Sequence, residues 1–132
     1  MMRFPEGTTF TEEVTTEGFT CCEMRDGLPW TYQTDLYGAA AIAHCFLFGT
    51  YMDVHKKSNG QWDLKGVTIK RYWQKDLWLL VFSTLLNVPS CSAIPSLSEL
   101  KEKIITTFYR AQMDREFNSK LSQLLCIVAQ RR

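Results

Sequence analysis

The stretch YQTDLYGAAAIAHCFLFGTYM, residues 32–52, decides the fold, because it is almost wholly apolar apart from a single acidic residue, Asp35. Its alanines favour a helix from Asp35 to Phe48, and Gly49 supplies a stop. A glycine and a histidine interrupt the run, which falls short of the roughly 18 apolar residues expected of a membrane-spanning helix. A helix that is apolar on all sides is buried in a soluble chain, so we predict a central helix around which the other elements pack.

Asp35 stands at the head of this helix, and nothing near it in sequence satisfies a carboxylate. As an N-cap, its side-chain oxygen would accept the amide hydrogen of Tyr37 or Gly38, which is worth about 1 kcal/mol. The residues alone leave two other roles open: a catalytic carboxylate, and an anchor for a group outside the helix.

Composition places the chain among ordinary soluble domains. Its 132 residues suffice for one modest domain with a single core, and 45% of them are apolar against 22% charged. The net charge is +1, so the sequence carries no electrostatic signature of nucleic-acid or anionic-membrane binding. We therefore expect neither nucleic acid nor membrane among its partners.

The cysteines predict reduced thiols rather than disulfides or a metal site. They number five and stand at Cys21, Cys22, Cys45, Cys91 and Cys126. No apolar leader follows Met1, and no C-x-x-C pair provides zinc-ligand spacing. These features favour an intracellular protein whose thiols are small core side chains, with no metal bound.

Outside the central helix, the sequence predicts one long loop and three peripheral helices. Residues 1–31 have no sustained period, which indicates a functional loop or a frayed terminus. Asn59-Gly60 predicts a tight turn between short extended pieces in a surface excursion. A second helix is expected over 74–86. The pair Ser96 and Glu99 fits a capping box at the start of a third helix, and a fourth helix is expected toward the C-terminus. The predicted fold class is mainly α.

No catalytic constellation is visible in the sequence. It contains no G-x-S-x-G, H-E-x-x-H, P-loop or G-x-G-x-x-G pattern. His44 lies among Ala, Cys and Phe, where a histidine is more often a packed side chain than a general base. We therefore predict no catalytic residue and no cofactor for this chain.

The order of several motifs resembles the C-terminal half of a protein kinase catalytic domain. CCEM, which contains Glu23, occupies the place of the kinases' A-P-E motif, and DLYG that of their D-x-W-x-x-G signature. More narrowly, RFPEGTTF, GFTCCEM, PWTYQTDLYG, LFGTYM and LLNVP resemble the Bub (budding uninhibited by benzimidazoles) family of mitotic checkpoint serine/threonine kinases. The resemblance covers essentially the whole chain. It implies a kinase C-lobe in which residues 1–31 form an activation-segment-like loop and residues 32–132 a helical subdomain.

The resemblance also implies roles for individual residues. Glu23 would anchor the activation segment, which spans residues 3–24. Asp35 and Gly38 would form the structural anchor of the central helix, where the aspartate accepts backbone hydrogen bonds from the catalytic loop. The candidates for the substrate-receiving loop are Gly18, Phe19 and Thr20.

The parts that perform phosphoryl transfer are absent from these 132 residues. They contain no H-R-D-x-x-x-x-N loop, no D-F-G and no glycine-rich loop. Mg-ATP is therefore implied for a full-length kinase only, and this chain alone is expected to be catalytically incompetent. The partners implied are the missing kinase N-lobe and catalytic loop, Ser/Thr protein substrates and checkpoint proteins. The implied location is the nucleus, at the kinetochore or centromere.

A non-catalytic, pseudokinase-like interaction module is the alternative function. It predicts a chain that is stable and monodisperse in isolation. A kinase fragment separated from its N-terminal partner is instead expected to expose apolar surface and to aggregate.

Overall fold

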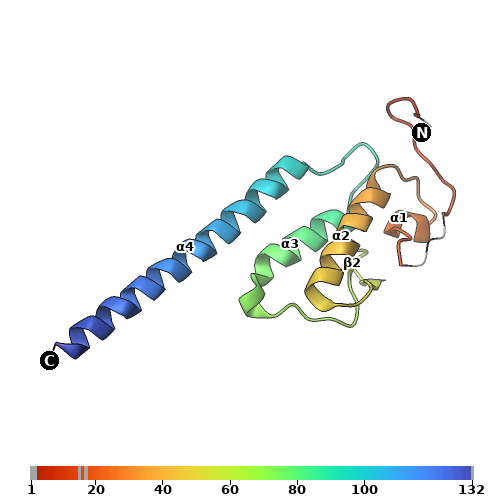
Figure 1. Ribbon diagram of the computed structural model, residues 1–132. Coiled ribbons are helices and arrows are strands. Elements are labelled where there is room, and N and C mark those ends of the chain that lie inside the picture. Colours follow the sequence, from red (N-terminus) through yellow and green to blue (C-terminus); the bar gives the residue numbers. More distant parts are fainter. Residues whose placement is uncertain (1–2, 15, 17, 132) are drawn as a thin grey trace. The chain divides into compact units, whose positions relative to one another are not determined.

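The computed structural model describes residues 3–14, 16 and 18–131. Contacts divide the chain into two compact units, Met1–Ser96 and Leu97–Arg132. The predicted boundaries, 1–31 and 32–132, did not include this division. The first unit contains, in order, α1 (Cys22–Arg25), α2 (Gln33–Phe48), β1 (Val54–Lys56), β2 (Trp62–Leu64), a 3₁₀ turn (Arg71–Trp73) and α3 (Lys75–Leu86); the second contains α4 (Leu97–Gln130). The mainly α fold is confirmed (Figure 1).

Helix α2 begins earlier than predicted and ends where predicted. The amides of Asp35 and Leu36 both donate to the Tyr32 carbonyl oxygen at 3.0 Å, so the helix is already established before Asp35. No side chain caps the first turn and the N-cap position is Tyr32, so the N-cap role left open for Asp35 is excluded. Gly49 has φ +71° and donates its amide hydrogen to the Cys45 carbonyl at 2.9 Å, which closes the helix as expected.

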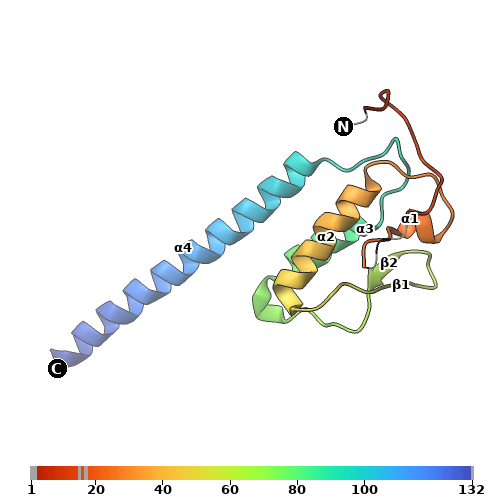
Figure 2. The same cartoon turned by 45° about the vertical axis from the view of Figure 1, so that its right-hand side comes forward.

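The core of the first unit lies between α2 and α3, which run side by side in both views of the chain (Figures 1 and 2). The segment after Gly49, predicted as a surface excursion, also contributes to this core through Met52, Val54 and Ile69. The buried apolar residues of this unit are Cys21, Cys22, Met24, Leu36, Tyr37, Ala40, Ala41, Met52, Val54, Ile69, Leu77, Val81, Phe82, Leu85 and Leu86.

The predicted tight turn is confirmed by an antiparallel hairpin. Strands β1 and β2 pair with Val54 opposite Leu64 and Lys56 opposite Trp62. Between them the Asn59 side chain accepts the Gln61 amide at 3.0 Å, and the following glycine adopts φ +84°. The hairpin packs against α3 through β2.

Apart from α1, the described residues before α2 are irregular, and an aromatic pair on either side of α1 links them. Phe10 and Trp30 exchange two backbone hydrogen bonds of 2.8 Å, and their rings lie 5.0 Å apart. The Trp30 indole also donates to the Glu12 carbonyl at 2.8 Å. Residues 15 and 17, which belong to the predicted activation segment, lie outside the described part of the chain.

The second unit is a single helix, where two helices were predicted. Helix α4 begins at Leu97, directly after the predicted capping serine, and continues for 34 residues. The helix has no reason to stop midway, because no glycine or proline stands between Leu97 and Gln130. Across the described residues, no helix is both long and apolar enough to cross a membrane.

Candidate functional site

Helix α2 is buried on one face and open on the other, although its sequence is apolar all round. The buried face consists of Gln33, Leu36, Tyr37, Ala40, Ala41 and His44. The opposite face, here named the open face of α2, consists of Asp35, Ala39, Ile42 and Phe46, which the helical repeat aligns in one stripe. Ile42 is 55% exposed and Phe46 86% exposed. A central helix is thus present, but the described residues of the first unit cover only one side of it.

Asp35 heads the open face. Its side chain is exposed, and among the described residues it has neither a hydrogen-bond nor an ion-pair partner. Gly38 lies half-buried on the same helix, and a Cβ there would meet no heavy atom within 4 Å. Asp35 thus makes no side-chain contact that stabilises the described part of the fold. The role of Asp35 and Gly38 as an anchor stays a prediction.

The substrate-loop candidates lie immediately before α1. Gly18 adopts φ +80°, where a side chain would be strained. The Phe19 amide donates to the Thr16 carbonyl at 2.9 Å, and the Thr20 carbonyl accepts a hydrogen bond of 3.1 Å from Arg25 Nε. The three residues thus form a locally bonded segment, and their role in receiving a substrate remains a prediction.

Arg25 links this segment to the core, and sequence reasoning did not single it out. Its Nη2 donates to the Tyr37 hydroxyl at 3.1 Å, and its guanidinium lies 5.9 Å from the Tyr37 ring centre and 6.0 Å from that of Trp62. Burial raises the pKa of Tyr37, while the nearby Arg25 charge acts in the opposite direction. Only the tertiary fold brings these residues together, so no local pattern could have revealed the contact.

Glu23 lies on α1 and lines a cleft of about 690 Å³ within the first unit. Burial raises the pKa of its carboxyl, and the nearby Asp26 charge adds to this effect. Hydrogen bonds from its own backbone and from the Cys21 thiol act in the opposite direction. Among the described residues no cation pairs with Glu23.

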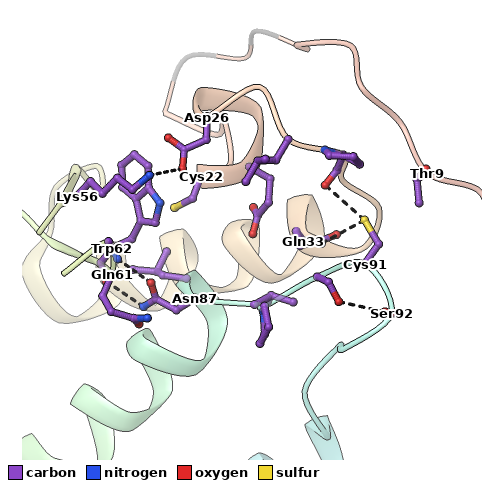
Figure 3. Close-up of a pocket in the computed structure, with 18 residues that line it drawn as sticks. Thr9, Cys22, Asp26, Gln33, Lys56, Gln61, Trp62, Asn87, Cys91 and Ser92 are labelled. Carbon is purple, nitrogen blue, oxygen red and sulfur yellow. Dashed lines mark hydrogen bonds and ion pairs between the residues drawn. The ribbon is translucent and has the colours of Figure 1, made fainter. Parts of the chain in front are cut away.

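The cleft combines an apolar wall with the amides of Asn87 and Gln33 and the thiol of Cys91, which are bonded to protein atoms (Figure 3). Asn87 Oδ1 accepts the Trp62 amide at 2.6 Å, and its Nδ2 donates to the Trp62 carbonyl at 3.0 Å. Gln33 Nε2 donates to the Cys91 sulfur at 3.5 Å. The remaining lining residues are Thr9, Cys22, Asp26, Leu28, Pro29, Lys56, Gly60, Gln61, Leu86, Val88, Pro89, Ser90 and Ser92.

The Cys22 thiol of the site is not suited to nucleophilic chemistry. All five thiols of the chain are free. Burial raises the pKa of Cys22 to about 12, with the neighbouring Glu23 charge adding to the shift, so the thiolate is scarcely populated at neutral pH. Within residues 3–14, 16 and 18–131, no three His, Cys, Asp or Glu side chains are grouped to hold a metal ion.

These elements place a long helix at the centre of the first unit, with α1 and α3 beside it. A central helix headed by an exposed aspartate, a preceding segment anchored through α1, and a flanking α3 define the class of the molecule as a protein-kinase-like C-lobe region. The comparisons with known proteins identify the family within this class.

No family model matches the chain. It is 37% identical over 124 residues to the mitotic checkpoint serine/threonine-protein kinase BUB1 of Mus musculus, which covers 94% of the chain and 11% of the relative. It is 35% identical to BUB1 of Arabidopsis thaliana, covering 92% of the chain and 23% of the relative. It is 38% identical to the spindle assembly checkpoint kinase BUB1 of Saccharomyces cerevisiae, covering 80% of the chain and 10% of the relative.

Among solved structures, the chain is similar to the BubR1 kinase domain. The TM-score is 0.75 at 39% identity, and the match covers 81% of the chain and 32% of the BubR1 domain. The chain belongs to the Bub family of checkpoint kinases and corresponds to the C-terminal region of their kinase domain. It spans between about a tenth and a quarter of the length of these curated relatives.

Proposed function

We propose that this chain is the C-lobe portion of a spindle-assembly-checkpoint serine/threonine kinase. In the full-length kinase, Mg-ATP would supply the phosphoryl group for Ser/Thr side chains of protein substrates at kinetochores in the nucleus. The chain itself contributes a scaffold: α2 supports the catalytic loop, and the segment before α1 receives the substrate. The implied partners are checkpoint proteins and the remaining part of the kinase domain.

The open face of α2 is the observation that carries this proposal. An exposed stripe made of Ala39, Ile42 and Phe46 is costly in water, because burying one large apolar side chain is worth about 1.5–3 kcal/mol. The unpartnered Asp35 carboxylate at its head is suited to accept backbone amide hydrogens of a docked loop. Both features are explained if the catalytic loop of a kinase covers this face.

The open face also bears on the alternative of a self-sufficient interaction module. Such a module would be expected to bury its central helix with its own residues, and the first unit leaves Phe46 86% exposed. The face therefore favours the kinase portion over the independent module.

Titration of Mg-ATP into the purified chain, followed by calorimetry, tests the catalytic part of the proposal. We expect no saturable binding and no phosphate transfer to a generic Ser/Thr substrate, because the residues that hold the nucleotide and the metal are not in this sequence. Saturable Mg-ATP binding by the chain alone would contradict the proposal.

A further inference from the structure

The C-terminal half of α4 carries an apolar stripe that no described residue of its own unit covers. Leu97–Arg132 contains no element other than this helix, which is unbroken in both views (Figures 1 and 2), and every side chain from residue 112 to residue 131 is exposed. Four large apolar side chains, between 43% and 67% exposed, define the α4 stripe: Phe117, Leu121, Leu124 and Val128. Helices in water are stabilised mainly by packing of an apolar face, so this half of α4 is expected to have a partner.

The spacing of the α4 stripe is that of a coiled coil. Its successive residues are separated by four, three and four positions, and a further step of three positions at each end leads to Asp114 and to Arg131. The Arg131 amide donates to the Val128 carbonyl at 3.3 Å, so the helical turn still continues at this residue. Alternating steps of three and four keep one seam of a helix turned toward a partner helix. The six positions, here named the α4 seam, thus have an apolar centre between one acidic and one basic end.

The α4 seam does not continue the apolar side of the first half of the helix. The apolar repeat of that half runs through Leu97, Leu100, Ile104 and Phe108. At 3.6 residues per turn, Ile104 lies about 140° around the helix from Phe117. An element that covers the first half on its apolar side would therefore leave the seam open for a different partner.

We propose that the α4 seam binds the same seam of a second copy of this chain, as an antiparallel pair of helices. The register follows from placing Leu121 of one copy opposite Leu124 of the other, at the middle of the seam. The other facing pairs are then Phe117 with Val128 and Asp114 with Arg131. All four apolar residues of each copy meet an apolar residue of the other, which is what a two-fold symmetric interface requires of a single surface.

Charge complementarity selects both the occupant and its orientation. Among the described residues, neither Asp114 nor Arg131 forms an ion pair within the chain. In the antiparallel pair each Asp114 faces Arg131 of the second copy, so opposite charges meet at both ends of the apolar centre. A parallel pair would instead place Asp114 against Asp114 and Arg131 against Arg131, and such like-charge contacts are unfavourable. The seam is therefore complementary to itself in one orientation.

Sedimentation equilibrium of the full chain at pH 7 tests the proposal. Every sample carries Phe46→Ser as a background, which removes the open face of α2 as a second source of self-association. We expect a monomer–dimer equilibrium with a Kd of the order of 100 µM or below. In this background Leu124→Ser should raise the Kd about tenfold or more, whereas Ile105→Ser, 55% exposed on the same helix but off the seam, should change it less than about threefold.

Three outcomes of this measurement would overturn the proposal. The first is a chain that stays monomeric up to about 1 mM, ten times the expected Kd. The second is a series of oligomers larger than the dimer. The third is an equal effect of Leu124→Ser and Ile105→Ser, because the seam would then contribute no more than any exposed apolar residue of the helix.

Charge reversal tests the register while keeping every apolar side chain, so it also serves if Leu124→Ser loses the helix. At low ionic strength, Asp114→Arg alone and Arg131→Asp alone should each raise the Kd by about threefold or more, because each places like charges at both ends of the pair. Glu116→Arg, an equal charge change off the seam, should have a smaller effect. The double variant Asp114→Arg/Arg131→Asp should return to the Kd of the background chain.

Mixing the two single charge variants shows whether the contact lies between chains. An equimolar mixture should form a mixed dimer about as tight as that of the background chain, and a contact within one chain could not produce this rescue. A double variant as weak as the single ones would overturn the antiparallel register. A mixture that associates no better than its components would overturn the pairing of two copies.

Discussion

At the scale of single residues, the first unit depends on a few side chains that join elements distant in sequence. Asn87 is the clearest case: it stands at the end of α3 and bonds to both backbone groups of Trp62 on β2, while its Nδ2 also reaches the Ser83 carbonyl at 3.1 Å. Arg25 joins the segment before α1 to α2, because it donates hydrogen bonds to the Thr20 carbonyl and to the Tyr37 hydroxyl. Asn87 itself lines the cleft, whereas Arg25 acts outside it.

Replacing Asn87 with alanine should lower the free energy of unfolding by about 1–3 kcal/mol, because the amide and carbonyl of Trp62 lose their partners. Urea unfolding followed by tryptophan fluorescence measures the change. Asn118→Ala, at an exposed position on α4, is the matched control and should stay within about 0.5 kcal/mol of the wild type. An Asn87→Ala value as small as that of the control would show that the bridge does not stabilise the fold.

Glu23 should make the stability of the chain depend on pH. Its pKa is raised above the ordinary 4.5 by burial, so the folded state binds the proton more tightly than the unfolded state. The free energy of unfolding should therefore fall as the pH rises from 4.5 toward the raised value. The Glu23→Gln variant has no carboxyl to ionise at this position and should not lose stability in this way. The free energy of unfolding of the variant minus that of the wild type should therefore be larger at pH 7 than at pH 4.

Urea unfolding of both proteins at the two pH values measures this difference. Glu13→Gln, whose side chain is exposed, provides the control for the loss of one negative charge. A difference between Glu23→Gln and wild type that stays constant with pH, or that shrinks as the pH rises, would contradict the burial of the charged carboxylate.

At the scale of elements, the sequence predicts which segments form but not which of their faces are covered. Alanine-rich composition and Gly49 predict α2 and its end, and the turn chemistry of Asn59-Gly60 predicts the hairpin, because both signals are local. The open face of α2 could not be predicted from periodicity, since Ile42 and Phe46 are as apolar as the residues on the buried face. The number of helices after Ser96 was overestimated for a related reason: shifts in apolar periodicity do not break a helix that lacks glycine and proline.

The cleft could not be predicted from the sequence, because its lining residues come from several separate elements. Its walls come from α1, from the segments on either side of α1, from the start of α2, from the β1–β2 hairpin, and from the end of α3 and the loop that follows it. These stretches meet only through tertiary packing, so neither their spacing nor their composition indicates a shared site. Glu23 was singled out through its resemblance to a kinase motif, while Gln33, Trp62, Asn87 and Cys91 were not.

Replacing Phe46 with serine should reduce self-association of the chain, because it removes a large apolar side chain that is 86% exposed. The free energy of unfolding should stay within about 0.5 kcal/mol of the wild type, because the substitution removes little buried surface. Size-exclusion chromatography with light scattering measures the monomer fraction. Tyr72→Ser, at an aromatic position that is 74% exposed and lies off the open face, is the control and should change the monomer fraction less. Equal effects of the two substitutions would mean that the open face has no special tendency to bind apolar surface.

At the scale of the whole molecule, the chain consists of two compact units with different characters. Met1–Ser96 contains a core, the open face of α2 and the cleft, whereas Leu97–Arg132 is a single helix. Every residue assigned a role by resemblance to kinases, from Gly18 to Gly38, lies in the first unit. The kinase-like properties of the chain are therefore expected to reside there.

A chain shortened to end at Ser96 should keep the fold of the first unit. Its ¹H–¹⁵N spectrum should retain the dispersed signals of Tyr37, Phe82 and Asn87, because their partners all lie before the division. Collapse of these signals to random-coil positions would show that the first unit does not fold without α4.

The central claim is that the open face of α2 receives the rest of a Bub-family kinase domain. The most direct measurement is the affinity of this chain for the part of such a kinase domain that precedes the matched region, determined by biolayer interferometry. We predict that the wild-type chain binds, that Phe46→Glu weakens binding by about 100-fold or more by placing a charge in an apolar contact, and that Tyr72→Glu binds like the wild type. Binding by Phe46→Glu as tight as that of the wild-type chain would contradict the claim.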